Sequence, residues 1–224
     1  MRITHRLLFA ALLCGSANWA FAGLITYDVT ANTSSISGTT GSIDFNFNPG
    51  PLATQPASLQ ILGFTTDGSL VAGSQQATND ASGTLPGTLT FDNGTVFNDY
   101  FQEFTFGSML VFQVSLYGPA LSSPDPADYP GDSTFVFSMF SDTEGQDPVL
   151  TTSPQGYALT VDVNSDGTTT PFSYSSQTGA DAEAPEPGGL ALAGVAMACL
   201  GALQLRGRRP WQVRARRADS VSTM

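Results

Sequence analysis

The chain has 224 residues, of which 41% are hydrophobic and only 12% charged, and its formal net charge is −11. There is no lysine, the only histidine is His5, and residues 23–187 contain no basic side chain and no cysteine. Nucleic acid is therefore excluded as a partner of this central segment, because nothing in it can neutralise phosphates. Ser-His-Asp and Cys-His catalysis, lysine Schiff bases and His/Cys zinc sites are excluded there for want of the residues.

Residues 1–22 have the pattern of a secretory signal peptide. An apolar run at 7–13 follows three residues that carry or can carry positive charge, Arg2, His5 and Arg6. Ala20-Phe21-Ala22 then supplies the small-x-small pattern of a cleavage site. We expect signal peptidase to cleave between Ala22 and Gly23, so that the mature chain is exported.

Residues 23–174 are expected to form one all-β domain, an antiparallel β-sandwich or jelly roll. Short segments alternate apolar and polar residues and are separated by Gly, Pro, Asn and Asp, which is typical of strands with one buried face. Many of the fifteen phenylalanines lie on these segments and are expected to supply the core. The candidate strands are Leu24–Thr30, Ser42–Phe47, Ser58–Phe64, Thr88–Phe91, Tyr100–Phe106, Leu110–Tyr117, Thr134–Ser141, Tyr157–Val163 and Thr168–Tyr174.

Two of these strands and one turn allow sharper predictions. In Leu110–Tyr117 the inward residues are expected to be Leu110, Phe112, Val114 and Leu116. In Thr134–Ser141 they are expected to be Phe135, Phe137 and Met139, with Thr134 and Ser138 facing water. Asp92-Asn93-Gly94 is the strongest hairpin signal, because Asn-Gly accepts the positive φ angles of a type I′ turn.

The segment Asp162-Val163-Asn164-Ser165-Asp166-Gly167 has two interpretations. It matches the opening D-x-[DN]-x-[DN]-G of a calcium loop, which would place Ca²⁺ on Asp162, Asn164 and Asp166. The twelfth position, where a bidentate Glu is expected, is Ser173, and the flanking segments have strand patterns. A β-hairpin that turns at residues 164–167 is therefore the favoured interpretation, and calcium the alternative.

The C-terminal part divides into three predicted segments. Residues 175–187 are rich in Ser, Gly, Ala, Asp and Pro and are expected to be a flexible acidic linker. Residues 188–205 are apolar except for Gln204 and reach about 27 Å as a helix, close to a ~30 Å bilayer core, so a transmembrane helix is expected. Residues 206–224 are arginine-rich and are expected to be a cytoplasmic tail, which leaves the β domain outside the membrane.

The order of these segments resembles the PEP-CTERM sorting signal of Gram-negative bacteria. The matching residues are the tripeptide Pro185-Glu186-Pro187, the apolar stretch 188–205, and a basic stop at Arg206, Arg208 and Arg209. The resemblance implies transient anchoring in the inner membrane, processing by an exosortase-type protease, and release to a cell surface or extracellular matrix rich in polysaccharide. It covers only the tail, and the chain continues from 210 to 224, beyond the usual end of such a signal. The alternative is a permanent single-span anchor.

Three functions follow for the domain in front of this tail. The first is a non-enzymatic surface protein associated with extracellular polysaccharide or biofilm matrix, without a cofactor. The second is a carbohydrate-binding module, which needs exposed aromatic rings; the candidates are Tyr100, Tyr117, Tyr129, Tyr157 and Tyr174. The third is a carboxylate-only glycosidase. Asp99 and Glu103 share a strand face, but about 13 Å of strand separates them, more than the roughly 5–9 Å of glycosidase pairs.

Overall fold

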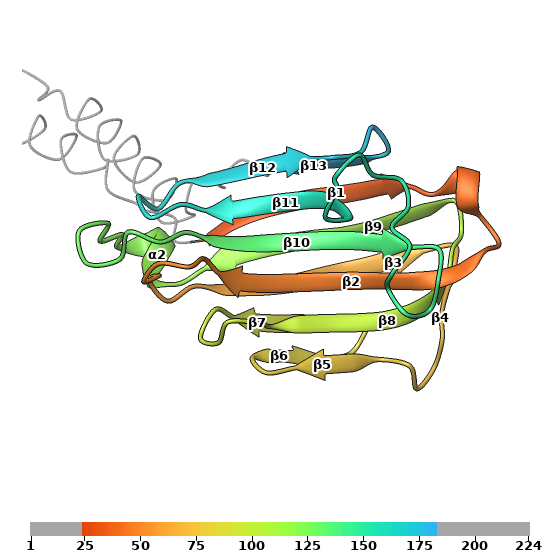
Figure 1. Ribbon diagram of the computed structural model, residues 1–224, viewed down its shortest axis with the longest axis horizontal. Coiled ribbons are helices and arrows are strands. Elements are labelled where there is room, and N and C mark those ends of the chain that lie inside the picture. The colour runs from red at the N-terminus through yellow and green to blue at the C-terminus, as the bar shows by residue number, and fades with distance from the viewer. Residues whose placement is uncertain (1–23, 183–224) are drawn as a thin grey trace, which may run out of the picture. The chain divides into compact units, whose positions relative to one another are not determined.

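The computed structural model describes residues 24–182, which form two antiparallel sheets packed face to face as a sandwich (Figure 1). All nine candidate strands are present, with ends that differ by at most two residues. The predicted all-β class is therefore confirmed. The expected signal peptide and transmembrane helix lie outside the described residues, and among the described residues no helix has the length and apolarity needed to cross a membrane.

The first sheet has six strands. From one edge to the other they are β13 (Thr178–Ala182), β1 (Leu24–Asn32), β9 (Met109–Tyr117), β3 (Ser58–Thr66), β7 (Leu89–Asp92) and β6 (Ala81–Gly83). Each strand is antiparallel to its neighbours, and β1 pairs with β9 over its whole length, from Leu24 opposite Tyr117 to Asn32 opposite Met109.

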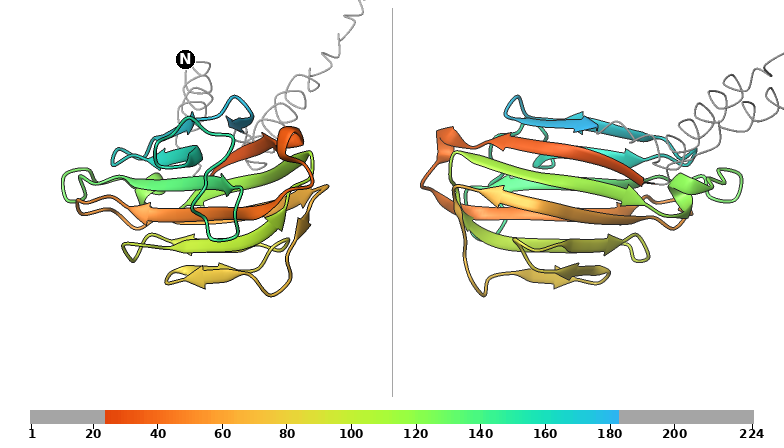
Figure 2. Two further views of the ribbon diagram at one scale, coloured as in Figure 1. Left: turned by 45° about the vertical axis from the view of Figure 1, so that its right-hand side comes forward. Right: turned by 180° about the vertical axis from the view of Figure 1, so that it is seen from behind.

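The second sheet has β10 and β2 at its centre. Its strands are, in spatial order, β12 (Thr169–Ser173), β11 (Tyr157–Val163), β10 (Ser133–Phe140), β2 (Thr40–Pro49), β8 (Asp99–Thr105) and β4 (Ser69–Leu70), with β5 (Gln76–Thr78) also paired to β8. The views in Figure 2 show this sheet as one layer and β1, β9 and β3 as the other. Two short helical turns, η1 (Ser34–Ile36) and α2 (Pro119–Ser122), lie in connections.

Alternation of side chains along the strands produces the core between the sheets. On β2, Ile43, Phe45 and Phe47 point inward and are fully buried. The Phe45 ring lies 5.2 Å from that of Phe112 on the opposite sheet, in an edge-to-face arrangement. Each such ring contributes a few kcal/mol, from ~25 cal/mol per Å² over about 150 Å² or more. The inward sets predicted for β9 and β10 are confirmed, since all seven side chains have no exposed surface.

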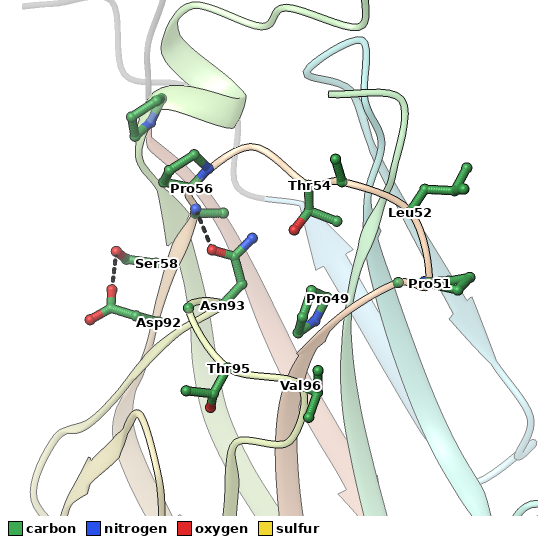
Figure 3. A pocket seen from close by; sticks show the side chains of 15 residues that line it. Pro49, Pro51, Leu52, Thr54, Pro56, Ser58, Asp92, Asn93, Thr95 and Val96 are labelled. Carbon is green, nitrogen blue, oxygen red and sulfur yellow. Dashed lines mark hydrogen bonds between the residues drawn. The ribbon is translucent and has the colours of Figure 1, made fainter. Parts of the chain in front are cut away.

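The predicted hairpin at Asp92-Asn93-Gly94 is wrong. The strand before this turn, β7, belongs to the first sheet, whereas the strand after it, β8, belongs to the second. The Asn93 side chain is buried and serves the crossing itself: its Oδ1 accepts from the Ala57 amide at 2.9 Å, and its Nδ2 donates to Gln55 O at 2.9 Å and to Ser133 Oγ at 2.8 Å. This turn residue thus links the β7–β8 connection to residues 55–57 and to the start of β10. Figure 3 shows Asn93 with one of these bonds.

The linker expected at 175–187 is wrong in its first part, because β13 lies inside it. This strand pairs with β1, with Val29 opposite Ala180, and continues the first sheet to Ala182. Its sequence, TGADA, has weak strand propensity. The unpaired edge of β1 supplies hydrogen-bonding partners that the local sequence does not reveal.

A segment between β10 and β11, residues 141–156, crosses the outer face of the second sheet (Figure 1). Its Asp142 carbonyl accepts from Ser42 Oγ at 2.9 Å, and its Gly145 lies against the Phe101 ring. On the same face Ser138 is only 3% exposed, so the expectation that it faces water is wrong. This outer face is therefore partly covered.

Candidate functional site

The outer face of the second sheet carries a cluster of polar side chains on its central strands. Along β2, the residues between the buried Ile43, Phe45 and Phe47 point outward, and these include Asp44 and Asn46. Asp99, on β8, stands directly opposite Asn46 in the strand register, and Phe101 stands opposite Asp44. Because neighbours of this kind share one face of a sheet, Asp44, Asn46 and Asp99 lie together. We call them the carboxyl cluster.

Hydrogen bonding in the carboxyl cluster is incomplete. Asn46 Nδ2 donates to Asp44 Oδ2 at 2.8 Å. The other oxygens of the two side chains, Asp44 Oδ1 and Asn46 Oδ1, are buried and have no hydrogen-bond partner. The carboxyl group of Asp99 lies within hydrogen-bonding reach of Asp44. Two ionised carboxylates can only accept, so neither can satisfy the other unless a proton or a cation lies between them.

Burial is the main electrostatic influence on this cluster. It raises the pKa of Asp44 well above the ordinary value of an aspartate, the neighbouring Asp99 raises the pKa further, and the amide of Asn46 opposes both. Residues 24–182 contain no lysine, arginine or histidine, so no cationic side chain of the domain compensates the pair. The cluster can hold a shared proton or a hard cation that prefers oxygen ligands.

The predicted calcium residues lie elsewhere on the same sheet, in a β-hairpin. β11 and β12 pair antiparallel, the turn is closed by the Asn164 amide donating to Thr168 O at 2.9 Å, and Gly167 has a φ of +82°. The favoured hairpin interpretation is thus confirmed. Asp162 and Asp166 accept from different threonines, Thr134 Oγ1 at 2.7 Å and Thr168 Oγ1 at 2.6 Å respectively.

The side chain of Asn164 also bonds within the hairpin: its Nδ2 donates to Thr168 Oγ1 at 2.9 Å and to Thr170 Oγ1 at 3.0 Å. The three proposed ligands therefore each have protein partners, and calcium at this loop stays a prediction. Within residues 24–182, no three His, Cys, Asp or Glu side chains are grouped so that they could hold a metal ion. The carboxyl cluster is not a group of this kind, because it contains only two such side chains, Asp44 and Asp99, and its third member is an asparagine.

An open groove of about 600 Å³ lies at one end of the sandwich (Figure 3). It is lined by residues 49–54, 56–58 and 92–96 and by Pro119. Among the described residues that line it, Asp92 alone is charged, and its Oδ1 accepts from Ser58 Oγ. Leu52 and Val96 on its rim are 59% and 86% exposed. None of these described lining residues is aromatic, so none of them offers a ring on which a sugar could stack.

The tyrosines proposed as stacking platforms differ in exposure. Tyr100 is fully buried, donates to Gln102 Oε1 at 2.6 Å and accepts from the Leu85 amide, so its proposed role as an exposed ring is wrong. Tyr157 and Tyr174 lie together, with ring centroids 6.2 Å apart. Phe172 joins them at 4.7 Å from Tyr174 and is 55% exposed. We call these three the aromatic cluster; Tyr117 and Tyr129 do not belong to it.

The predictions from sequence did not include the carboxyl cluster, and they did not include Phe172 among the aromatic residues. A signal for the first exists in Asp44-Phe45-Asn46-Phe47-Asn48, where alternate positions carry oxygen and would share one face of a strand. Nothing local indicates that Asp99 lies opposite. As predicted, Asp99 and Glu103 point to the same face of β8.

In comparisons with known proteins, no family model, no curated protein and no solved structure matches the chain. The sorting motif Pro185-Glu186-Pro187, the basic stop at Arg206, Arg208 and Arg209, and the cleavage position between Ala22 and Gly23 lie outside the described residues. The class that the structure defines is an acidic, antiparallel, two-sheet β domain.

Proposed function

We propose that this chain is a non-enzymatic, exported surface protein that a PEP-CTERM sorting signal delivers and that associates with extracellular polysaccharide. The carrying observation is the division of charge: the folded domain has no basic side chain, and every arginine lies in a terminal segment. A signal peptide, a sorting tripeptide, an apolar stretch and an arginine stop stand in the order that export and anchoring require.

Processing then determines where the domain resides. Signal peptidase cleaves after Ala22, residues 188–205 hold the intermediate in the inner membrane, and an exosortase-type protease cuts near Pro185-Glu186-Pro187. The product is released to the surface or matrix of a Gram-negative bacterium. It carries acidic groups only, which suits a hydrated anionic matrix and disfavours nucleic acid.

Mass spectrometry of the mature protein tests this delivery. The full gene is expressed in a Gram-negative host with and without an exosortase, beside a variant in which Pro185, Glu186 and Pro187 are all alanine. We expect a C-terminus near residue 185 only for the unaltered chain in the exosortase host. An intact tail through Met224 in that host would overturn the sorting proposal and favour a permanent anchor.

Neither of the two carboxyl pairs described above has the spacing of a glycosidase pair. Glycosidases need two carboxyls about 5–9 Å apart with the sugar between them. The Asp44 and Asp99 carboxyls lie closer, within hydrogen-bonding reach of each other. Asp99 and Glu103 are separated by four residues of one strand, which spans about 13 Å.

The aromatic cluster favours a second candidate function, a carbohydrate-binding module. Phe172, Tyr174 and Tyr157 provide neighbouring rings on β12, after it and on β11, and Phe172 exposes more than half of its surface. Neighbouring rings are inclined by 63° and 70°, so they form a bent surface rather than a flat row. Such a surface fits a twisted polysaccharide chain better than a flat crystalline one.

Affinity electrophoresis in gels containing bacterial exopolysaccharide tests this second function. We expect the Phe172→Ala variant to lose most of the retardation that the unaltered protein shows. Phe97→Ala is the matched control, because Phe97 is also a half-exposed phenylalanine (48%) but does not belong to the aromatic cluster. Equal migration of the unaltered protein with and without polysaccharide would contradict the carbohydrate-binding function.

A further inference from the structure

We propose that the carboxyl cluster, Asp44, Asn46 and Asp99, binds one hard divalent cation, for which Ca²⁺ is the best match. This site is separate from the Asp162–Gly167 hairpin and from the aromatic cluster, and it does not depend on the delivery route proposed above. Three observations carry it: unpartnered buried oxygens, uncompensated negative charge, and placement on the central strands of a sheet.

The unpartnered oxygens indicate a missing electropositive partner. Asp44 Oδ1 and Asn46 Oδ1 are buried without a hydrogen bond, although buried polar atoms in folded proteins almost always have one. The Asn46 side chain is only 9% exposed, and its amide group already contacts Asp44 through Nδ2 at 2.8 Å. The amide oxygen is thus held beside the carboxyl pair by the same planar group.

A cation would satisfy more of the groups in the carboxyl cluster than a shared proton would. A proton between Asp44 and Asp99 would engage one oxygen of each carboxyl group, but it would leave the Asn46 oxygen without a donor. A cation contacts all three residues and neutralises both carboxylates. No lysine, arginine or histidine of residues 24–182 competes for that role.

The donor set determines which cation fits. Carboxylate and amide oxygens are hard ligands that suit Ca²⁺ and disfavour zinc and copper, for which the cluster has no nitrogen or sulfur ligand. Ca²⁺ takes six to eight oxygens, so water would complete the shell. With two carboxylates, we expect a dissociation constant on the order of 10⁻⁴ to 10⁻³ M, the range of extracellular modules.

The cluster is also held in place before a ligand arrives. Asn46 and Asp99 face each other across the ladder between β2 and β8, and β2 is paired on its other side with β10. Flanking residues on the same face are covered by residues 141–156, through Ser42 and Phe101. Ligands on such strands lose little conformational freedom on binding.

The test combines calorimetry and thermal unfolding of the full chain, treated with EDTA and then titrated with CaCl₂. We expect heat for one Ca²⁺ per chain, and a Tm that rises more with millimolar CaCl₂ than with NaCl of equal ionic strength, since NaCl supplies only screening. In the Asp99→Asn variant the affinity should fall at least tenfold. Asp44→Asn serves as a second variant if the first does not fold. The matched control is the double variant Asp162→Asn, Asp166→Asn, which loses two carboxylates of the hairpin and should bind as the unaltered protein does.

Three outcomes would overturn the proposal. The first is no heat and no Tm change with calcium in the unaltered protein. The second is loss of binding in the hairpin variant but not in Asp99→Asn, which would place calcium at the hairpin. The third is an absence of calcium response together with a Tm that falls as the pH rises above the ordinary range of a carboxyl group, only while Asp99 is present, which would assign a shared proton to the pair.

Discussion

Single polar side chains hold together segments of this domain that are distant in the sequence. Asn93 contacts Gln55, Ala57 and Ser133 from a turn that joins the two sheets, and its side chain is only 7% exposed. Asp67, in the connection after β3, accepts from the Ser108 and Met109 amides at 2.8 and 3.0 Å and from Ser108 Oγ at 2.6 Å. Residues 24–182 contain no basic side chain and no cysteine, so neither salt bridges nor disulfides can form among them. Hydrogen bonds of this kind are therefore the main polar links between distant segments.

Replacement of Asn93 by alanine is expected to lower the free energy of unfolding by about 2–3 kcal/mol. The change leaves the Ala57 amide and Ser133 hydroxyl buried without their partner, and each unsatisfied group costs roughly 1–3 kcal/mol. Urea unfolding followed by circular dichroism measures the loss. Asn32→Ala is the control, because Asn32 is exposed and its side chain accepts from the amide and hydroxyl of the nearby Ser34. A midpoint for Asn93→Ala equal to that of the control would contradict the proposed role.

Asp67 is expected to make stability depend on pH in the acid range. The hydroxyl of Ser108 first, and then the Met109 amide, lower the pKa of Asp67 below its ordinary 3.8. The charged form is thus the one stabilised by folding, so its contribution is present above pH 3.8 and is lost as the pH falls through the lower folded value. Thermal melts should give Asp67→Asn a lower Tm than the unaltered protein at pH 7, with the difference shrinking below pH 3.8. A difference that is constant with pH would contradict this.

At the scale of elements, hairpins and edge strands are positioned by what they pack against. The turn between β11 and β12 contacts the connection that contains α2: a Cβ built on Gly167 would lie 2.9 Å from Pro124 Cγ and 3.1 Å from Ala120 O. The Ser165 amide also donates to Asp132 Oδ1 at 2.7 Å. The hairpin is therefore restricted both by its own backbone and by its neighbour.

Alanine substitutions at two glycines distinguish the cost of the backbone conformation from the cost of the contact with the neighbouring segment. Gly167 and Gly73 have nearly the same backbone angle, with φ of +82° and +83°, but a Cβ at Gly73 would meet no atom within 4 Å. We expect Gly73→Ala to cost about 1–2 kcal/mol for the left-handed conformation alone, and Gly167→Ala to cost more, because of the added contact. Chemical denaturation of both variants measures the difference. Equal losses would show that the hairpin tip does not press on Pro124.

At the scale of the whole molecule, stability rests on apolar burial against a background of uniform negative charge. Residues 24–182 contain fourteen aspartates, two glutamates and no basic residue, hence a formal charge of −16. The core that offsets this repulsion contains eight fully or almost fully buried phenylalanines, Phe45, Phe47, Phe91, Phe104, Phe106, Phe112, Phe135 and Phe137. Salt bridges within this part of the chain cannot form.

Screening of this repulsion should make the protein more stable in salt. We expect the Tm to rise between 10 mM and 500 mM NaCl, because the Debye length falls from about 30 Å to less than 8 Å. Differential scanning calorimetry measures the shift, and KCl should give the same rise, since screening depends on ionic strength and not on the identity of the ion. A Tm that is unchanged or lower at high salt would contradict the role of charge repulsion.

Local pattern was sufficient to predict nine of the thirteen described strands and the buried faces of β9 and β10, but not β4, β5, β6 and β13. The period of two in β9 and β10 identified inward residues such as Phe112 and Phe137, because alternation is a property of each strand by itself. The chemistry of turns was less reliable. Asn164 forms a hairpin turn as predicted, whereas Asn93 bridges two sheets, since local propensity does not specify which strand comes next in space.

The sequence by itself therefore determined the all-β class, the inward faces of the central strands and the absence of basic chemistry in the domain. Only the tertiary structure decided that β13 pairs with β1, that Ser138 is covered, and that Asp99 stands beside Asp44 and Asn46. The physical reason is that these features depend on pairing between distant strands. Such pairing follows from burial of the whole core, which no short window of residues contains.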